Sequence, residues 1–305
     1  MHSDYILKTT DLTKKYKNKV AVENINMTIK KGDIYGLIGK NGAGKTTLMK
    51  LILSLAYPTN GEVELFGSKN FVDSRGRIGS LIETPGYYKG ASAKENILRF
   101  AALYGVPADE AIALLSKVGL QDAIDKKVGK FSLGMKQKLG IAIALLGNPE
   151  FVILDEPVNG LDPEGMVDVR KTIQRLNQEE GITFLISSHL LSELSKAATR
   201  YGIIQDGHLI EEFSSDEIAG DTYKIVISTP NNSMASAAAV AIRQKMPDLQ
   251  VEPCNNEITV ISDTDICGEL NTLLVKDNGL VVNRLNIEFK TVEQYFLEKV
   301  GVANE

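Results

Sequence analysis

Residues 39–46 read Gly39-Lys40-Asn41-Gly42-Ala43-Gly44-Lys45-Thr46 and fit the pattern of a glycine-rich phosphate loop. The glycines allow a tight turn that brings backbone N–H groups against phosphate oxygens. The lysine supplies positive charge for the β- and γ-phosphates, and the threonine hydroxyl can hold Mg²⁺. Ile34 to Ile38 predict a buried strand before the loop, and Thr46 to Leu55 predict a helix after it, whose positive end faces the phosphates. The stretch therefore predicts a nucleotide site in an α/β domain.

A second stretch, Phe151-Val152-Ile153-Leu154-Asp155-Glu156, places two acids at the end of a predicted buried strand. Ligands of open α/β sheets bind at the carboxyl ends of the strands, so we expect both carboxylates there. Asp155 would hold Mg²⁺, directly or through water, and Glu156 would act as general base for an attacking water. An acid pair after a strand can also cap a helix. Its combination with the phosphate loop favours nucleotide hydrolysis.

The rest of the chain predicts two domains. Up to about residue 218, short apolar runs alternate with helical patterns, which is typical of a largely parallel sheet. The composition changes after Ser214, and we expect domains at 1–218 and 219–305. The second domain is expected to be a small α+β unit, with a ferredoxin-like arrangement as the candidate. The predicted elements of the first domain include a strand at 183–187, a hairpin at 203–210 and helices at 93–104 and 108–117; those of the second are strands at 223–228, 249–251, 257–261 and 280–282 and helices at 234–246, 266–275 and 291–300.

Composition and charge exclude several classes of protein. The chain has 305 residues and a net charge of −5, which argues against general nucleic-acid binding because that needs a basic surface. The longest apolar run, Ile141 to Leu146, falls far short of the roughly 20 residues of a membrane span. The N-terminus lacks the pattern of a signal peptide. Cys254 and Cys267 have no metal-site spacing and are expected to be free thiols in a reducing cytosol.

Three further motifs follow a recognisable order: Phe131-Ser132-Leu133-Gly134-Met135-Lys136-Gln137, then Gly160-Leu161-Asp162, then Ser188-His189. Together with the loop and the acid pair, they make the region from Tyr5 to Phe213 resemble the nucleotide-binding domain of ABC transporters. The stretch Ile78 to Tyr88 is similar to the ATP-binding subunits of bacitracin-type and lantibiotic-immunity exporters. The resemblance implies an α/β P-loop NTPase of the ABC ATPase type, with an antiparallel β subdomain and a helical subdomain, followed here by the small C-terminal domain.

The resemblance also assigns residues outside the loop. Tyr16 matches the aromatic residue that stacks on adenine, although a half-buried tyrosine at a strand edge is the alternative. Ser132 and Gly134 match the signature motif that completes the ATP site of an opposing subunit; Ser132 could equally be a helix N-cap. The family consensus is Leu-Ser-Gly-Gly-Gln, so Leu133 and Met135 depart from it.

Two more residues match the family at the interface and at the γ-phosphate. Asp162 matches the acid of the loop that crosses the dimer interface, and His189 matches the switch histidine that positions Glu156 and the attacking water. The expected nucleotide-binding residues are Tyr16, Gly39, Lys40, Asn41, Gly42, Ala43, Gly44, Lys45, Thr46, Thr47, Ser132, Gly134 and Asp162; the expected catalytic residues are Lys45, Glu83, Glu156 and His189, and the expected metal ligands are Thr46, Glu83 and Asp155.

Glu83 is a departure, because most members of the family carry glutamine there. The resemblance implies that this position senses Mg²⁺ and the attacking water. A glutamate near Asp155 and Glu156 would raise the pKa of these acids unless a metal compensates, so we expect stronger coupling to Mg²⁺. Neutral drift at a loop position is the alternative.

The resemblance implies an ATP-binding, Mg²⁺-dependent ATP hydrolase that powers export of an antimicrobial peptide or lipid-active compound. Two copies, or one copy and a related subunit, would enclose two ATP molecules. A separate membrane permease would dock near Glu83 to Ile97, where Tyr87 and Tyr88 offer a docking surface or serve local packing. The chain would then be cytoplasmic and peripheral on the inner face of the cell membrane. The competing hypotheses are an ABC-type ATPase acting on ribosomes or DNA, and a regulator that binds ATP without turnover.

Overall fold

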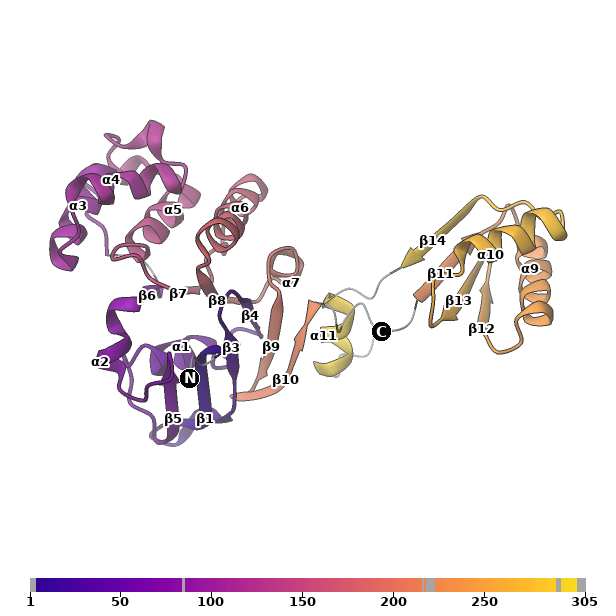
Figure 1. The fold of residues 1–305 in the computed structure, drawn as a ribbon, viewed down its shortest axis with the longest axis horizontal. Coiled ribbons are helices and arrows are strands. Elements are labelled where there is room, and N and C mark those ends of the chain that lie inside the picture. Colours follow the sequence, from indigo (N-terminus) through magenta and orange to yellow (C-terminus); the bar gives the residue numbers. More distant parts are fainter. Residues whose placement is uncertain (1–3, 84–85, 216, 218–222, 289–291, 301–305) are drawn as a thin grey trace. The chain divides into compact units, whose positions relative to one another are not determined.

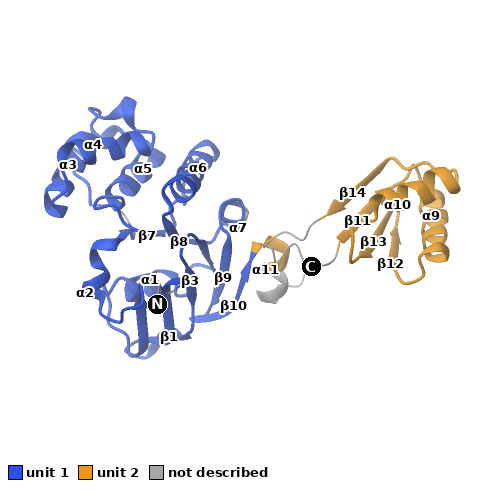
Figure 2. Cartoon of the chain, viewed as in Figure 1, with its two compact units in different colours: residues 1–214 blue, residues 215–305 orange. Residues whose placement is uncertain are grey.

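The computed structural model describes residues 4–83, 86–215, 217, 223–288 and 292–300 (Figure 1). The chain divides into two compact units, Met1–Ser214 and Ser215–Glu305 (Figure 2). Each unit is described by itself. Among the described residues, no helix has the length and apolar character needed to cross a membrane.

The first unit is built around a six-stranded sheet with the order β10-β9-β4-β8-β7-β6. Five strands run parallel, and β10 pairs antiparallel with β9. Every residue of three central strands is buried, as expected for parallel strands covered on both faces. The strands are β4 (Ile34–Ile38), β6 (Ile78–Leu81), β7 (Phe151–Asp155), β8 (Thr183–Ser188), β9 (Arg200–Gln205) and β10 (His208–Ser214).

A second, antiparallel sheet of the same unit has the order β2-β1-β3, with β5 paired to residues 7–13 of β1. The helix α1 (Lys45–Ile52) packs between the two sheets, and its Leu48, Met49 and Ile52 belong to one core with residues of both. The strands of this sheet are β1 (Tyr5–Tyr16), β2 (Lys19–Ile25), β3 (Thr28–Lys30) and β5 (Asn60–Leu65).

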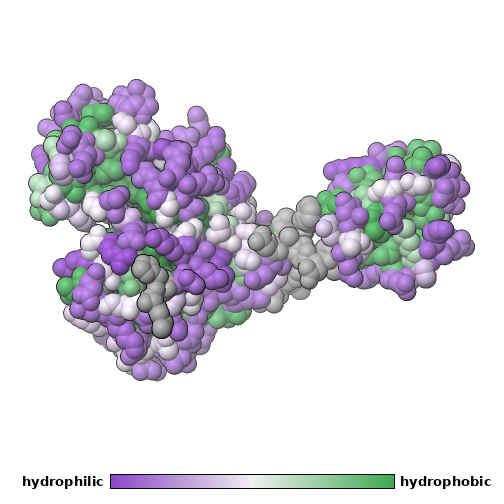
Figure 3. All heavy atoms as spheres, viewed as in Figure 1, coloured by the Kyte–Doolittle hydropathy of each residue, from purple (hydrophilic) through white to green (hydrophobic). Residues whose placement is uncertain are grey.

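Three helices of the first unit pack on one another and form its helical part: α3 (Ala93–Tyr104), α4 (Ala108–Lys117) and α5 (Leu133–Ala144) (Figure 1). A full capping box at Ser92 and Glu95 starts α3, and Gly105 in the left-handed region ends it. The hydropathy surface shows hydrophobic areas over this part (Figure 3), where Leu103 is 82% exposed. The remaining helices of the unit are α2 (Phe71–Ser74), α6 (Pro163–Glu180) and α7 (Leu191–Leu194).

The second unit is an antiparallel sheet with the order β12-β13-β11-β14 and a separate core. The element sequence β-α-β-β-α-β and this strand order are those of a ferredoxin-like arrangement. Its elements are β11 (Tyr223–Ser228), α9 (Asn232–Lys245), β12 (Gln250–Cys254), β13 (Glu257–Ser262), α10 (Cys267–Asn271) with a π-helical turn (Thr272–Asp277), β14 (Arg284–Glu288) and α11 (Val292–Val300).

The α/β fold class predicted from the sequence is confirmed, including the antiparallel and helical parts. Two predicted elements are wrong in position. The helix after the loop ends at Ile52 and not at Leu55, because Ser54 adopts a left-handed φ of 53°. The predicted strand at 280–282 is not a strand: the Leu280 N–H bonds back to the Leu274 carbonyl, and the fourth strand is β14, where Leu285 and Ile287 alternate with polar residues.

Gly79 on β6 gives a test of how the helical part packs on the sheet. A Cβ at this position would lie 1.9 Å from the backbone carbonyl oxygen of Ala144 on α5. We expect Gly79→Ala to lower the free energy of unfolding by about 1–3 kcal/mol, because the backbone of α5 must move. Denaturant unfolding measures this. Gly76→Ala is the control, since nothing lies within 4 Å of a Cβ there; equal stability of the two variants would contradict the packing.

Candidate nucleotide site

The glycine-rich loop joins β4 to α1 and depends on backbone geometry that only glycine supplies. Gly44 has a φ of 114°, and a Cβ there would lie 2.7 Å from the Ala21 carbonyl oxygen. The helix α1 starts directly after it and carries no acid in its first turn. Its free N–H groups and positive end therefore face the loop, which suits a bound phosphate.

Lys45 is a buried cation at the base of this loop. Only 6% of the residue is exposed, and its Nζ donates hydrogen bonds to the carbonyl oxygens of Gly39 (2.7 Å) and Lys40 (3.3 Å). The same Nζ lies 3.2 Å from Oε1 of Glu156. Two carbonyl oxygens and one carboxylate oxygen thus hold the ammonium group in the loop, where an anion bound there would contact it.

Asp155 sits at the end of β7 and accepts two hydroxyl hydrogen bonds. Thr46 Oγ1 donates to its Oδ2 at 2.7 Å, and Ser187 Oγ donates to its Oδ1 at 2.6 Å. Ser187 Oγ also accepts a 2.8 Å hydrogen bond from the backbone N–H of Glu156. The register of β7 and β8 pairs Asp155 with Ser187, which brings the hydroxyl between the two acids. Sequence analysis did not assign Ser187 a role; its place at the end of a buried strand beside the acid strand was the available signal.

The oxygens of Thr46 and Asp155 fit a magnesium ion. Mg²⁺ prefers hard oxygen ligands and is commonly held by one or two protein oxygens together with substrate phosphates. A hydroxyl and a carboxylate in direct contact, next to a phosphate loop, supply that donor set.

Glu156 is held between a cation and an imidazole. Its φ of 50° lies in the left-handed region, which is uncommon for a residue other than glycine. Oε2 lies 2.7 Å from His189 Nδ1. Oε1 is buried, faces Lys45 and makes no hydrogen bond. The Lys45 ammonium group, 3.2 Å away, is therefore the charged contact of this oxygen in the structure.

A cavity of about 370 Å³ lies over the loop. That volume falls in the range of small-molecule sites. Tyr16, at the end of β1, lines it, as do two residues that sequence analysis did not single out, Lys19 and Ala21. The lining residues are Tyr16, Lys19, Ala21, Asn41, Gly42, Gly44, Lys45, Thr46, Thr47 and Glu156.

Glu83 does not line this cavity. Its side chain is 65% exposed, its backbone φ is 61°, and its Oε1 lies 2.7 Å from Lys50 Nζ on α1. The hydrogen bond from Lys50 to Glu83 raises the pKa of the lysine. Lys50 therefore compensates the negative charge of Glu83. Of the docking tyrosines named above, Tyr88 is 58% exposed; the preceding residues Thr84 and Pro85 lie outside the described residues.

Ser132, Gly134 and Asp162 lie together but away from the cavity. Ser132 is the N-cap of α5 and its Oγ accepts from the Met135 N–H at 3.2 Å. Asp162 is the N-cap of α6, and its side chain caps nothing. A Cβ on Gly134 would lie 3.7 Å from the Cα of Gly165 on α6. The starts of α5 and α6 therefore lie side by side. Ser132 acts as the helix N-cap that was one of the two interpretations of its sequence position.

Comparison with known proteins connects this geometry to relatives. Residues 22–159 match the family described as ABC transporter. Over 300 residues the chain is 42% identical to the Bacitracin transport ATP-binding protein BcrA of Bacillus licheniformis, with 97% of each chain covered. Over 211 residues it is 43% identical to the Lantibiotic transport ATP-binding protein SrtF of Streptococcus pyogenes, which covers 69% of this chain and 92% of SrtF.

Solved structures give the same picture of the fold. One is the dimeric structure of an ATP-binding cassette in a post-hydrolysis state bound to ADP and Pi, with a TM-score of 0.62 and 26% identity over 68% of this chain and 98% of that chain. Another is cbiO1 from Clostridium perfringens, part of the ABC transporter complex cbiONQ, with a TM-score of 0.65 and 25% identity over 80% of this chain and 97% of that chain.

Ser187 offers a test of the acid cluster. Ser187→Ala removes the hydroxyl that links Asp155 to the Glu156 backbone. We expect kcat for ATP hydrolysis to fall about 10- to 100-fold, as for other residues that orient metal ligands, with ATP still bound. Steady-state phosphate release and a binding titration measure the two effects. Ser80→Ala on the neighbouring β6, where the serine is exposed, is the matched control; equal kcat in the two variants would contradict the role.

Proposed function

We propose that this chain, which belongs to the family of ABC transporter ATP-binding subunits, drives the export of a peptide antibiotic through a separate membrane permease. As a member of that family the chain binds and hydrolyses ATP. The observation that supports hydrolysis in this chain is the convergence of Lys45, Asp155, Glu156 and His189 at one loop.

In the proposed mechanism the triphosphate lies along the loop and the positive end of α1. Lys45 exchanges its carbonyl partners for phosphate oxygens, since a charged acceptor forms the stronger hydrogen bond. Mg²⁺, held by Thr46 and Asp155, would neutralise charge on the β- and γ-phosphates. These residues position the substrate and stabilise charge, which is most of what phosphoryl transfer requires.

Glu156 is proposed as the general base. Oε1, which lies 3.2 Å from Lys45 Nζ, would accept a proton from the attacking water once Lys45 has turned to the phosphates, while Oε2 stays fixed by His189. The ion pair with the Lys45 ammonium group keeps Oε1 directed toward the loop. His189 therefore acts in the proposal through the orientation of Glu156 as well as by its reach toward the γ-phosphate.

The cavity is proposed to be half of an ATP site. Lys45, Thr46 and Glu156 line it, whereas Ser132, Gly134 and Asp162 lie on the helix starts of the same chain and do not. A second copy that presents the Ser132 surface to the cavity would close over the γ-phosphate with a hydroxyl and a helix N-terminus. The dimeric cassette with ADP and Pi is a relative at 26% identity, which supports such a pair. The Leu133 side chain, 45% exposed beside Ser132, would take part in that contact.

The names of the relatives support a cargo class and a location for this chain. BcrA is named for bacitracin transport and SrtF for lantibiotic transport, and both antibiotics are peptides. We therefore assign peptide antibiotics as the cargo class, and a place at the inner face of the membrane beside the permease. The alternative of an ATPase acting on ribosomes or DNA is not favoured, because these relatives are named as transport proteins.

The base assignment predicts a separation of binding from turnover. Glu156→Gln should reduce phosphate release by about 10²- to 10⁴-fold, because the amide cannot accept the proton. The variant should still bind ATP and form a dimer in ATP, detected by size-exclusion chromatography with light scattering. Lys45→Ala is the companion variant and should lose ATP binding. Near-normal turnover by Glu156→Gln would refute the general base, and an ATP-bound monomer would refute the shared site.

Glu83 is proposed to sense Mg²⁺ only after it leaves Lys50. Glu83→Gln removes both the charge and the ion pair, so the Mg²⁺ concentration for half-maximal hydrolysis should shift more than the affinity for ATP. A Mg²⁺ titration of phosphate release at saturating ATP measures the shift. Lys50→Met, which frees Glu83 without changing it, should move the midpoint in the opposite direction. Superimposable Mg²⁺ profiles for the wild type and Glu83→Gln would contradict the proposal.

A further inference from the structure

Lys14 lies over the ring of Tyr16. Its Nζ is 4.9 Å from the ring centroid, within the range of a cation–π interaction. The two residues lie two positions apart on β1. The pairing of β1 with β2 is irregular on both sides of Lys14, between Leu12 and Lys14 and between Lys14 and Lys15. Such irregularities re-aim side chains locally.

The ammonium group of Lys14 is fixed by the segment that follows α1. It donates a 2.6 Å hydrogen bond to the Tyr57 carbonyl oxygen. The same segment holds the strand: the Thr59 N–H bonds to the Thr13 carbonyl at 2.8 Å, and the Lys15 N–H bonds to Thr59 Oγ1 at 3.0 Å. A carbonyl partner leaves the positive charge of Lys14 intact, whereas a carboxylate would neutralise it.

The ring of Tyr16 therefore has two different faces. Tyr16 lines the cavity above the phosphate loop, and Lys14 does not. Tyr16 is 47% exposed and the Lys14 ammonium group lies over one face of its ring, so a base in the cavity would stack on the opposite face. A cation on one face draws π-electron density toward it and makes the other face less negative. That change reduces the repulsion between stacked π systems.

We propose that Lys14 positions Tyr16 and strengthens the stacking of the purine base on its open face. The inference rests on the proposed role of Tyr16 in the ATP site. Lys14 is a positioning residue, because it acts through the tyrosine ring and makes no contact in the cavity. A ring that is already oriented loses less freedom when the base binds, so its stacking contributes more to affinity.

A double-mutant cycle on ATP affinity tests the inference in the full chain. The variants are Lys14→Met, Tyr16→Ala and the double variant, with ATP binding measured by isothermal titration in Mg²⁺. Lys14→Met keeps most of the apolar stem and should weaken ATP binding about 2- to 5-fold. Tyr16→Ala should weaken it about 5- to 100-fold through loss of stacking. In the Tyr16→Ala background, Lys14→Met should have no further effect.

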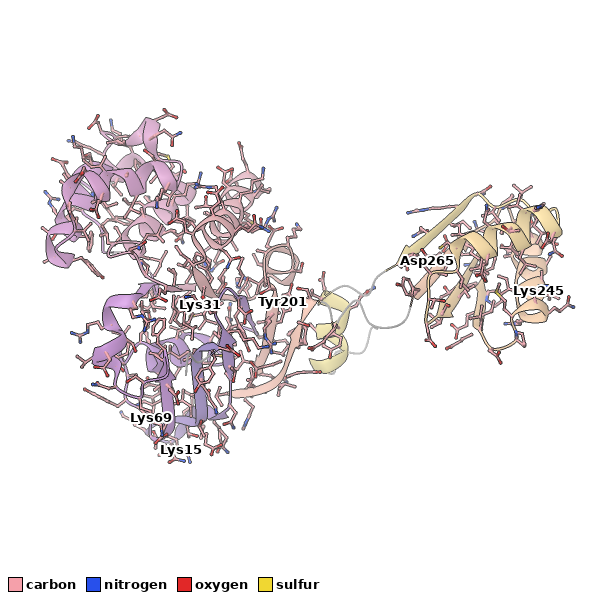
Figure 4. The ribbon with its side chains drawn as sticks, viewed as in Figure 1. Lys15, Lys31, Lys69, Tyr201, Lys245 and Asp265 are labelled. Carbon is pink, nitrogen blue, oxygen red and sulfur yellow. The ribbon has the colours of Figure 1, made fainter. Side chains whose placement is uncertain are left out.

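Two controls separate positioning from fold stability. Lys15→Met removes the neighbouring exposed lysine, labelled in Figure 4, which has no ring contact, and should leave affinity unchanged. Lys14→Arg keeps a cation able to cover the ring and should restore affinity. The effect of Lys14→Met should appear in KM and not in kcat, because the catalytic acids are untouched.

The outcomes distinguish the role of Lys14 from the proposed role of Tyr16 in the ATP site. A loss of affinity that requires Tyr16 and is restored by arginine supports the inference. An equal loss with and without Tyr16, or no loss at all, overturns the role of Lys14 and leaves the ATP site standing. Unchanged ATP affinity in Tyr16→Ala overturns the stacking role of Tyr16 and the inference with it.

Discussion

The burial of the Lys45 ammonium group is the interaction on which the site depends. A charge that is 6% exposed is costly unless oxygens surround it, and here two carbonyls of the loop and one carboxylate do so. The loop must therefore curl around its own lysine, which requires the glycine conformations at Gly42 and Gly44. The Lys45 charge holds Oε1 of Glu156. His189 contacts Oε2 and so sets the orientation of the carboxylate.

The parallel register turns separate motifs into one cluster. Asp155 pairs with Ser187 across β7 and β8, and β4, which leads into the loop, pairs with β8 on its other side. A slip of one residue would turn Ser187 to the opposite face of the sheet and break its bonds to Asp155 and to the Glu156 backbone. The completely buried strands resist such a slip, because it would move large apolar side chains as well. The core of the sheet thus holds the chemistry in place.

Local patterns were enough to predict the loop, the acid pair and the surrounding strands, since each is a contiguous stretch with its own physical signature. Lys19 and the Lys50–Glu83 pair were out of reach, because they depend on contacts between distant segments, and for Ser187 the sequence offered only its place at the end of a buried strand. The misplaced strand at 280–282 has a related cause. Three adjacent apolar residues look like a strand in isolation, but the sheet accepts the later segment whose Leu285 and Ile287 match Ile227 and Ile225 of β11.

The helix α1 lies between the phosphate loop and the segment that contacts Lys14. Its first residue, Lys45, belongs to the phosphate loop, and the segment after its last turn supplies the Tyr57 carbonyl that accepts the hydrogen bond from Lys14. Eight residues of helix span about 12 Å. Because α1 is packed in the core through Leu48, Met49 and Ile52, both ends keep a fixed separation. In the proposed site, α1 therefore joins the phosphate loop to the segment that holds Lys14 of β1 over Tyr16.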